Sequence, residues 1–135
     1  MTGDQKILKW SLLAGALYFF MVSVAHLIGW KVPVLFVYFN VPSQAYQDGI
    51  ISFLAFGWAV FLFTAQTNLT GQDALVRAVL VSGGGALVGL GRINLFTDFN
   101  ALGAQINPAV FWLETAGLFA YWLCLLVFYL RTKRG

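Results

Sequence analysis

Residues 8–30 read LKWSLLAGALYFFMVSVAHLIGW, and after Lys9 this stretch holds no Lys, Arg, Asp or Glu. A helix needs about 17–25 predominantly apolar residues to cross about 30 Å of hydrocarbon. The stretch meets both conditions, so it predicts a membrane-spanning helix. Comparable apolar segments follow it along the chain, and we expect four helices in all, at 8–30, 46–65, 73–96 and 108–130.

The overall composition agrees with this interpretation. Hydrophobic residues make up 60% of the chain and charged residues 10%, and the mean hydropathy is +0.80. Soluble domains carry about 25% charged residues. We therefore expect an all-α, multi-pass membrane protein whose four transmembrane helices form one bundle over residues 1–135, joined by an apolar interfacial loop at 31–45.

The basic residues are distributed unevenly between the two ends of these helices. With four spans, both termini lie on the same side as the middle loop, and this side holds six of the eight Lys and Arg residues: Lys6, Lys9, Arg77, Arg131, Lys133 and Arg134. The other side holds Lys31 and Arg92. Positively charged loops stay in the cytoplasm, so the predicted orientation has both termini inside. The basic residues flank spans and form no separate patch, which argues for lipid as the partner and against nucleic acid.

The helix expected at 73–96 is rich in small residues. Gly85 and Gly89 form a G-x-x-x-G pair, and Ser82 and Ala86 add small side chains one turn apart. Small residues let two helices approach closely in lipid. They predict either packing inside the bundle, with bulky rings from the helix at 108–130 filling the groove, or contact with a second copy or another membrane subunit.

Four polar residues are expected within or beside the spans on the non-cytoplasmic side: His26, Asp48, Arg92 and Glu114. Ionisable groups at membrane depth usually face the protein interior and pair with one another. Arg92 and Glu114 have similar expected depths and opposite charges, so we predict an ion pair or a shared hydrogen-bonded network. This cluster either fastens helices together or lines a ligand pocket, and the sequence leaves both alternatives open.

His26 also raises the question of a cofactor. A lone histidine can ligate haem iron or chlorophyll magnesium, but it more often serves as a structural hydrogen-bonding group. The sequence contains no set of residues spaced as metal ligands. In the loop after His26, the aromatic run predicts low exposure of Phe36, Tyr38 and Phe39, whether the loop lies in the interface or folds back as a lid.

Several short motifs resemble those of the DoxX-like group of small bacterial four-helix membrane proteins. They are AHL at 25–27, YQDG at 46–49, GLGR at 89–92 and WLE at 112–114. The resemblance implies a four-helix bundle and, in some relatives, a subunit role beside quinone-linked oxidoreductases. It identifies no catalytic residue in this chain. We expect a location in a bacterial inner membrane or a thylakoid-type membrane.

Function is less well defined than fold. The sequence contains no P-loop, HExxH or G-x-S-x-G motif and offers no catalytic residue set. We therefore expect a non-catalytic membrane subunit or scaffold that packs with itself or with a larger complex. One alternative is a binding or transport protein for a lipid-soluble or anionic ligand at the outer polar pocket, and another is a subunit that binds haem or pigment through His26.

Overall fold

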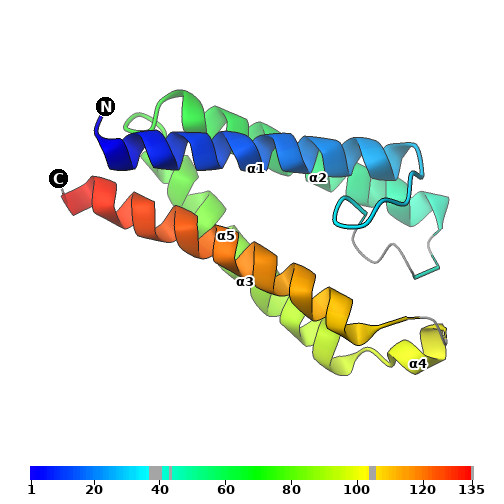
Figure 1. Cartoon of the computed structure of the whole chain (residues 1–135). Helices are drawn as coiled ribbons and strands as arrows, with labels where there is room; N and C mark the ends of the chain where they lie inside the picture. Colours follow the sequence, from blue (N-terminus) through cyan, green and yellow to red (C-terminus); the bar gives the residue numbers. More distant parts are fainter. Residues whose placement is uncertain (37–40, 43, 104–105, 135) are drawn as a thin grey trace.

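The computed structural model describes residues 1–36, 41–42, 44–103 and 106–134. These residues form only helices: α1 (Gly3–Leu27), α2 (Ala45–Thr67), α3 (Asp73–Phe96), the single-turn α4 (Phe99–Leu102) and α5 (Pro108–Arg134) (Figure 1). The four long helices each have the length and hydropathy needed to cross a membrane. The predicted four-helix membrane fold is therefore confirmed.

The helix boundaries differ from the predicted ones where local hydrogen bonds act. α1 starts at Gly3 because Thr2 and Gln5 form a capping box, in which each side chain accepts a hydrogen bond from the other residue's backbone N–H. It ends at Leu27, before Gly29 adopts a left-handed φ of 67°. α5 starts at Pro108, as predicted, and the side chain of Asn107 accepts a hydrogen bond from the Ala109 amide.

The four long helices form two pairs. α1 packs along α2, and α5 packs against both α3 and α1. Both chain termini lie at one end of the molecule, and the two pairs diverge toward the other end (Figure 1). The buried apolar core sits at the terminal end, where it includes Leu8, Leu12, Leu62, Val76 and Leu125.

Large apolar side chains remain on the outside of all four long helices. Examples are Leu17 (57% exposed), Phe53 (74%), Val88 (75%) and Leu113 (74%). A soluble protein rarely leaves such extended apolar surface uncovered. Lipid covers it at no cost, so this surface agrees with a bilayer environment.

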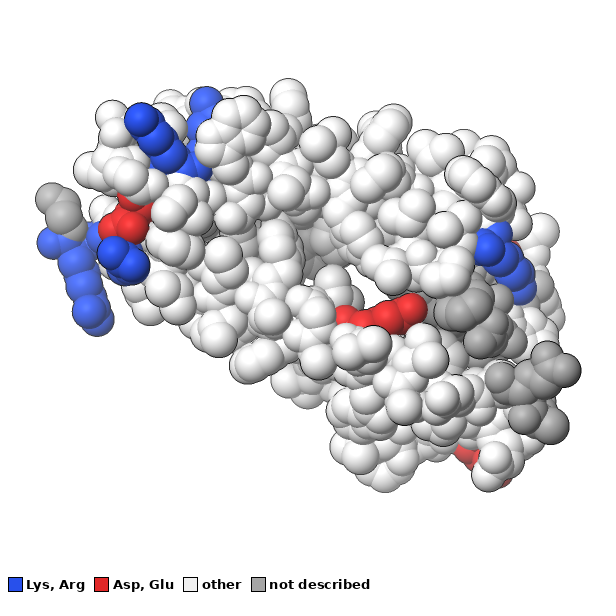
Figure 2. Space-filling model, viewed as in Figure 1, with Lys and Arg blue, Asp and Glu red and all other residues white. Residues whose placement is uncertain are grey.

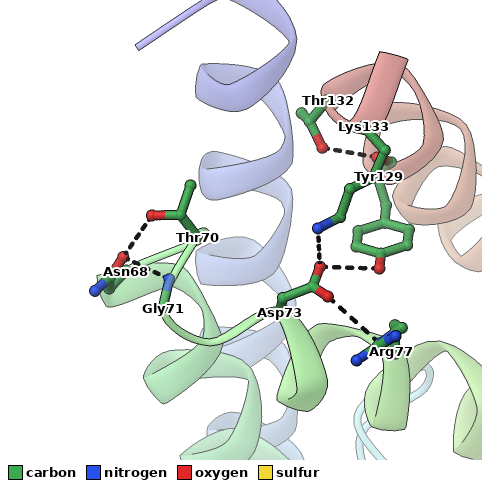
Figure 3. Close-up of polar contacts among 8 residues, drawn as sticks. All are labelled: Asn68, Thr70, Gly71, Asp73, Arg77, Tyr129, Thr132 and Lys133. Atoms are coloured by element: carbon green, nitrogen blue, oxygen red, sulfur yellow. Dashed lines mark hydrogen bonds and ion pairs between the residues drawn. The ribbon is translucent and has the colours of Figure 1, made fainter. Parts of the chain in front are cut away.

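Most charged side chains in this view lie at the two ends of the molecule, and the band between them is apolar except for one acidic side chain (Figure 2). At the terminal end, the Asp73 carboxylate accepts hydrogen bonds from Lys133 Nζ (2.5 Å) and Tyr129 Oη (2.9 Å) and pairs with Arg77 Nε (3.4 Å) (Figure 3). Asp73 and Arg77 are four residues apart, so they lie one turn apart on the same side of α3. The network ties the start of α3 to the end of α5.

The glycines of α3 pack differently from the prediction. Ser82, Gly85, Ala86 and Gly89 are all exposed, and an added Cβ at Gly85 or Gly89 would meet nothing within 4 Å. Of the two alternatives predicted for these four residues, packing inside the bundle is therefore wrong, and contact with a second copy or another membrane subunit stays a prediction.

The neighbouring glycines fill that role instead. Gly83 and Gly84 lie against the indole of Trp122 in α5, which donates a hydrogen bond from Nε1 to the carbonyl oxygen of Leu80 (2.7 Å). A large ring from the last helix does fill a glycine groove on α3. The groove is formed by Gly83 and Gly84, on a different face of the helix from Gly85 and Gly89.

Candidate ligand-binding cavity

A cavity of about 580 Å³ lies where the two helix pairs diverge. Its walls come from α1, α3, α5 and the first residues of the outer loop, and they are mostly apolar or aromatic. The lining residues are Ala14, Gly15, Tyr18, Phe19, Pro33, Val34, Leu90, Asn94, Val110, Phe111, Leu113, Glu114, Thr115, Gly117, Leu118 and Tyr121.

Glu114 is the only charged residue in this lining. It lies in the second turn of α5, about 9 Å along the helix from Pro108 at about 1.5 Å per residue. Figure 2 shows an acidic side chain at the rim of a hollow within the apolar band. A carboxylate held in an apolar wall at membrane depth is costly unless a proton or a cation accompanies it.

The outer edge of the cavity is formed by a strained turn. Val34 has a φ of 71°, a conformation that β-branched residues rarely adopt and that costs on the order of 1–3 kcal/mol. Two contacts hold this turn in place: the Tyr18 hydroxyl donates to the Val34 carbonyl (2.7 Å), and the Glu114 carboxyl approaches the Val34 backbone. Pro33 and Val34 therefore form one side of the cavity.

The inner limit of the cavity is formed by Tyr121. Its hydroxyl reaches across to α1 and donates to the Ser11 carbonyl (3.0 Å). This approach depends on Gly15, because any Cβ at that position would overlap the Tyr121 hydroxyl.

On the α3 side, the cavity is lined by Asn94, whose amide is buried. Its Nδ2 donates to Thr115 Oγ1 (2.9 Å) and to the Phe111 carbonyl (3.4 Å). Its Oδ1 has no hydrogen-bond partner among the described residues. The side chain is only 7% exposed, so an unpaired acceptor is held inside the protein beside the cavity.

His26 and Asp48 form a separate pair between α1 and α2. Nδ1 of His26 lies 3.2 Å from Asp48 Oδ1, and both residues are buried. One turn further in, the hydroxyls of Ser23 and Ser52 are 3.3 Å apart. The ring of Phe36 stacks on the imidazole with 3.7 Å between centroids and is itself buried, as predicted; Tyr38 and Phe39 lie outside the described residues.

The four predicted polar residues thus do not form one cluster. His26 and Asp48 pair with each other, Glu114 lies in the cavity wall, and neither His26 nor Asp48 lines the cavity. Arg92 is exposed, and no ion pair joins it to Glu114 within the described part of the chain. The predicted Arg92–Glu114 ion pair is therefore wrong.

The surroundings of His26 also bear on the cofactor alternative. Its side chain has no exposed surface, and Nε2 has no hydrogen-bond partner among the residues described here. A haem or chlorophyll metal could reach Nε2 only after the covering residues moved. Over the same described residues, no group of three or more His, Cys, Asp or Glu side chains sits together to hold a metal ion.

Sequence reasoning missed Tyr18 and Tyr121 as cavity residues. Tyrosine is common in membrane proteins, and each of these rings looked like ordinary packing. Their role becomes visible only from contacts between helices that the fold creates, such as the contact between Gly15 and the Tyr121 hydroxyl. Comparison of the chain with protein-family models, with curated proteins and with solved structures returned no match, and the DoxX-like resemblance stays a prediction.

Proposed function

We propose that this protein binds a small lipid-soluble molecule in the cavity between α1, α3 and α5. The cavity itself is the observation that carries the proposal. Small-ligand sites typically measure about 300–1,000 Å³, with mostly apolar walls and a few polar groups that fix orientation. The cavity of about 580 Å³ with Glu114 and Asn94 in its wall has this character.

An anionic ligand is not part of this proposal. Arg92, the cation expected at the pocket, is not among the lining residues, and neither is any Lys or other Arg. A second negative charge beside Glu114 would be repelled in an apolar environment.

Photolabelling tests the proposal. Benzophenone is neutral and apolar, and under ultraviolet light it inserts into nearby C–H bonds. With the protein in lipid nanodiscs, we expect peptides of α1 and α5 that line the cavity to be labelled preferentially. Replacing Ala14 with Phe fills part of the cavity and should suppress this labelling, whereas Ala86→Phe on the exposed face of α3 should not. Uniform labelling of the apolar surface, unchanged by Ala14→Phe, would contradict the proposal.

A second candidate function is self-association through α3. It is supported by the exposure of Ser82, Gly85, Ala86 and Gly89 on one surface of that helix, since small residues mark close helix contacts in lipid. On this view the protein is a scaffold that packs against a second copy.

Native mass spectrometry in mild detergent tests this second candidate. Gly85→Leu should convert dimers to monomers, because the larger side chain blocks close approach of the two helices. Gly49→Leu, at an exposed glycine of α2 with open space around its Cα, should leave the dimers intact. A wild-type protein that is monomeric under all gentle conditions would eliminate self-association.

A further inference from the structure

The hydrogen-bonding groups of the cavity specify which kind of ligand it accepts. Both tyrosines among the described lining residues already use their hydroxyl proton. Tyr18 donates its hydroxyl proton to the Val34 carbonyl, and Tyr121 donates to the Ser11 carbonyl. Each phenol has only one O–H, so neither can donate to a bound molecule without giving up its present bond.

The same holds on the side formed by α3 and α5. The Asn94 amide nitrogen donates its two protons to Thr115 and Phe111. The Thr115 hydroxyl donates to the Phe111 carbonyl (2.8 Å). Because that carbonyl can only accept, the amide nitrogen of Asn94 must face it, and the Oδ1 atom must point the other way.

What the cavity still offers is acceptors. Asn94 Oδ1 has no partner among the described residues. The Glu114 carboxylate can accept about four hydrogen bonds, and no Lys or Arg joins it in the lining.

We propose that the cavity selects lipophilic ammonium compounds, with Glu114 as the counter-anion. This inference rests on the proposed function and specifies its ligand class. An ammonium group supplies a positive charge that balances the Glu114 carboxylate. It also brings N–H donors, whereas the donors of Tyr18, Tyr121 and Asn94 in the described part of the lining are already used. The apolar body of the ligand fills the remaining space between α1 and α5.

Competition against the benzophenone label tests the inference. Three compounds share a phenylbutyl body and differ only in the head group: 4-phenylbutylammonium, pentylbenzene with a methyl head, and 5-phenylpentanoate with a carboxylate head. Concentrations are compared as amounts in the membrane, so that different partitioning does not bias the result. We expect the ammonium to block labelling at a concentration about 10- to 100-fold below that of pentylbenzene, the ratio typical of a charge-assisted hydrogen bond. The carboxylate should compete most weakly.

Variants separate the role of Glu114 from general effects of charge. Glu114→Gln should bring the ammonium-to-methyl ratio close to one, while benzophenone labelling persists and shows that the cavity is intact. Asp98→Asn removes a negative charge from an exposed residue that caps α4 and should leave the ratio unchanged. Equal competition by ammonium and methyl in the wild type, or a ratio that survives in Glu114→Gln, would overturn the inference while leaving the binding function standing. Absence of specific cavity labelling in the wild type would instead overturn the proposed function, and the inference with it.

Discussion

A missing side chain at Gly15 allows α1 and α5 to meet. The Tyr121 hydroxyl occupies the space that a Cβ at Gly15 would take, and from there it reaches the backbone of Ser11. Gly15→Ala should therefore destabilise the protein by about 1–3 kcal/mol, the usual cost of forcing an atom into a packed site.

Gly57 in α2 is the matched control, because a Cβ there would meet nothing within 4 Å. Gly57→Ala should be neutral or stabilise by up to about 1 kcal/mol, since alanine favours the helix. Both values can be measured by reversible unfolding in mixed micelles followed by circular dichroism. Equal free energies of unfolding for the two variants would mean that the close Gly15–Tyr121 contact does not constrain the residue at position 15.

The buried His26–Asp48 pair fastens α1 to α2 near their outer ends. Asp48→Ala removes the partner of Nδ1 and leaves the imidazole buried. Hydrogen bonds between membrane helices contribute about 0.6 kcal/mol on average and at most about 1.7 kcal/mol, so we expect a loss in that range in the same unfolding measurement. Gln47→Ala, at the exposed neighbouring position, should change stability by less than about 0.5 kcal/mol. An Asp48→Ala variant with the same free energy of unfolding as the wild type would show that the pair does not stabilise the protein.

Between helices, Trp122 joins α5 to α3. Its ring packs on Gly83 and Gly84, and its Nε1 donates to Leu80. Trp122→Phe keeps an aromatic ring but loses the donor, and it should cost about 1 kcal/mol. Trp112→Phe, at an exposed site on the same helix, should have little effect. The unfolding midpoints of the two variants measured side by side check this prediction.

The elements themselves were largely predictable, since the length and composition of an apolar segment are local properties. The contacts between them were not, because depth along a helix says nothing about direction around it. Arg92 and Asn94 illustrate this: at about 100° per residue they point roughly 200° apart. Asn94 faces inward, so Arg92 faces outward and misses Glu114. The same rotation separates the half-buried Gly83 from the exposed Gly85.

At the scale of the whole molecule, the shared position of the two termini and the excess of basic residues there predict a cytoplasmic location for that end. Single-cysteine variants in a Cys124→Ala background can test it with an impermeant maleimide added to intact cells. Lys31→Cys should react at once, whereas Thr70→Cys and Arg134→Cys should react only after permeabilisation. The reverse pattern would mean that the protein is inserted the other way round.

The site was predictable only in part, because its cavity depends on how the whole molecule packs. The sequence singles out Glu114 and the two members of the His26–Asp48 pair, because ionisable residues are rare in lipid-facing segments. The cavity itself arises because the two helix pairs separate beyond the core at Leu12 and Leu62. That separation depends on the packing of all four long helices and has no signature in any one segment.

The placement of both chain ends opposite the cavity has a practical consequence. Both termini lie at one end of the molecule (Figure 1), and the turn at Val34 follows the far end of α1. A fluorescent protein or an affinity tag joined to either terminus is therefore well separated from that turn. Such fusions leave the mouth of the cavity unobstructed, so either terminus can carry the tag in the photolabelling experiments.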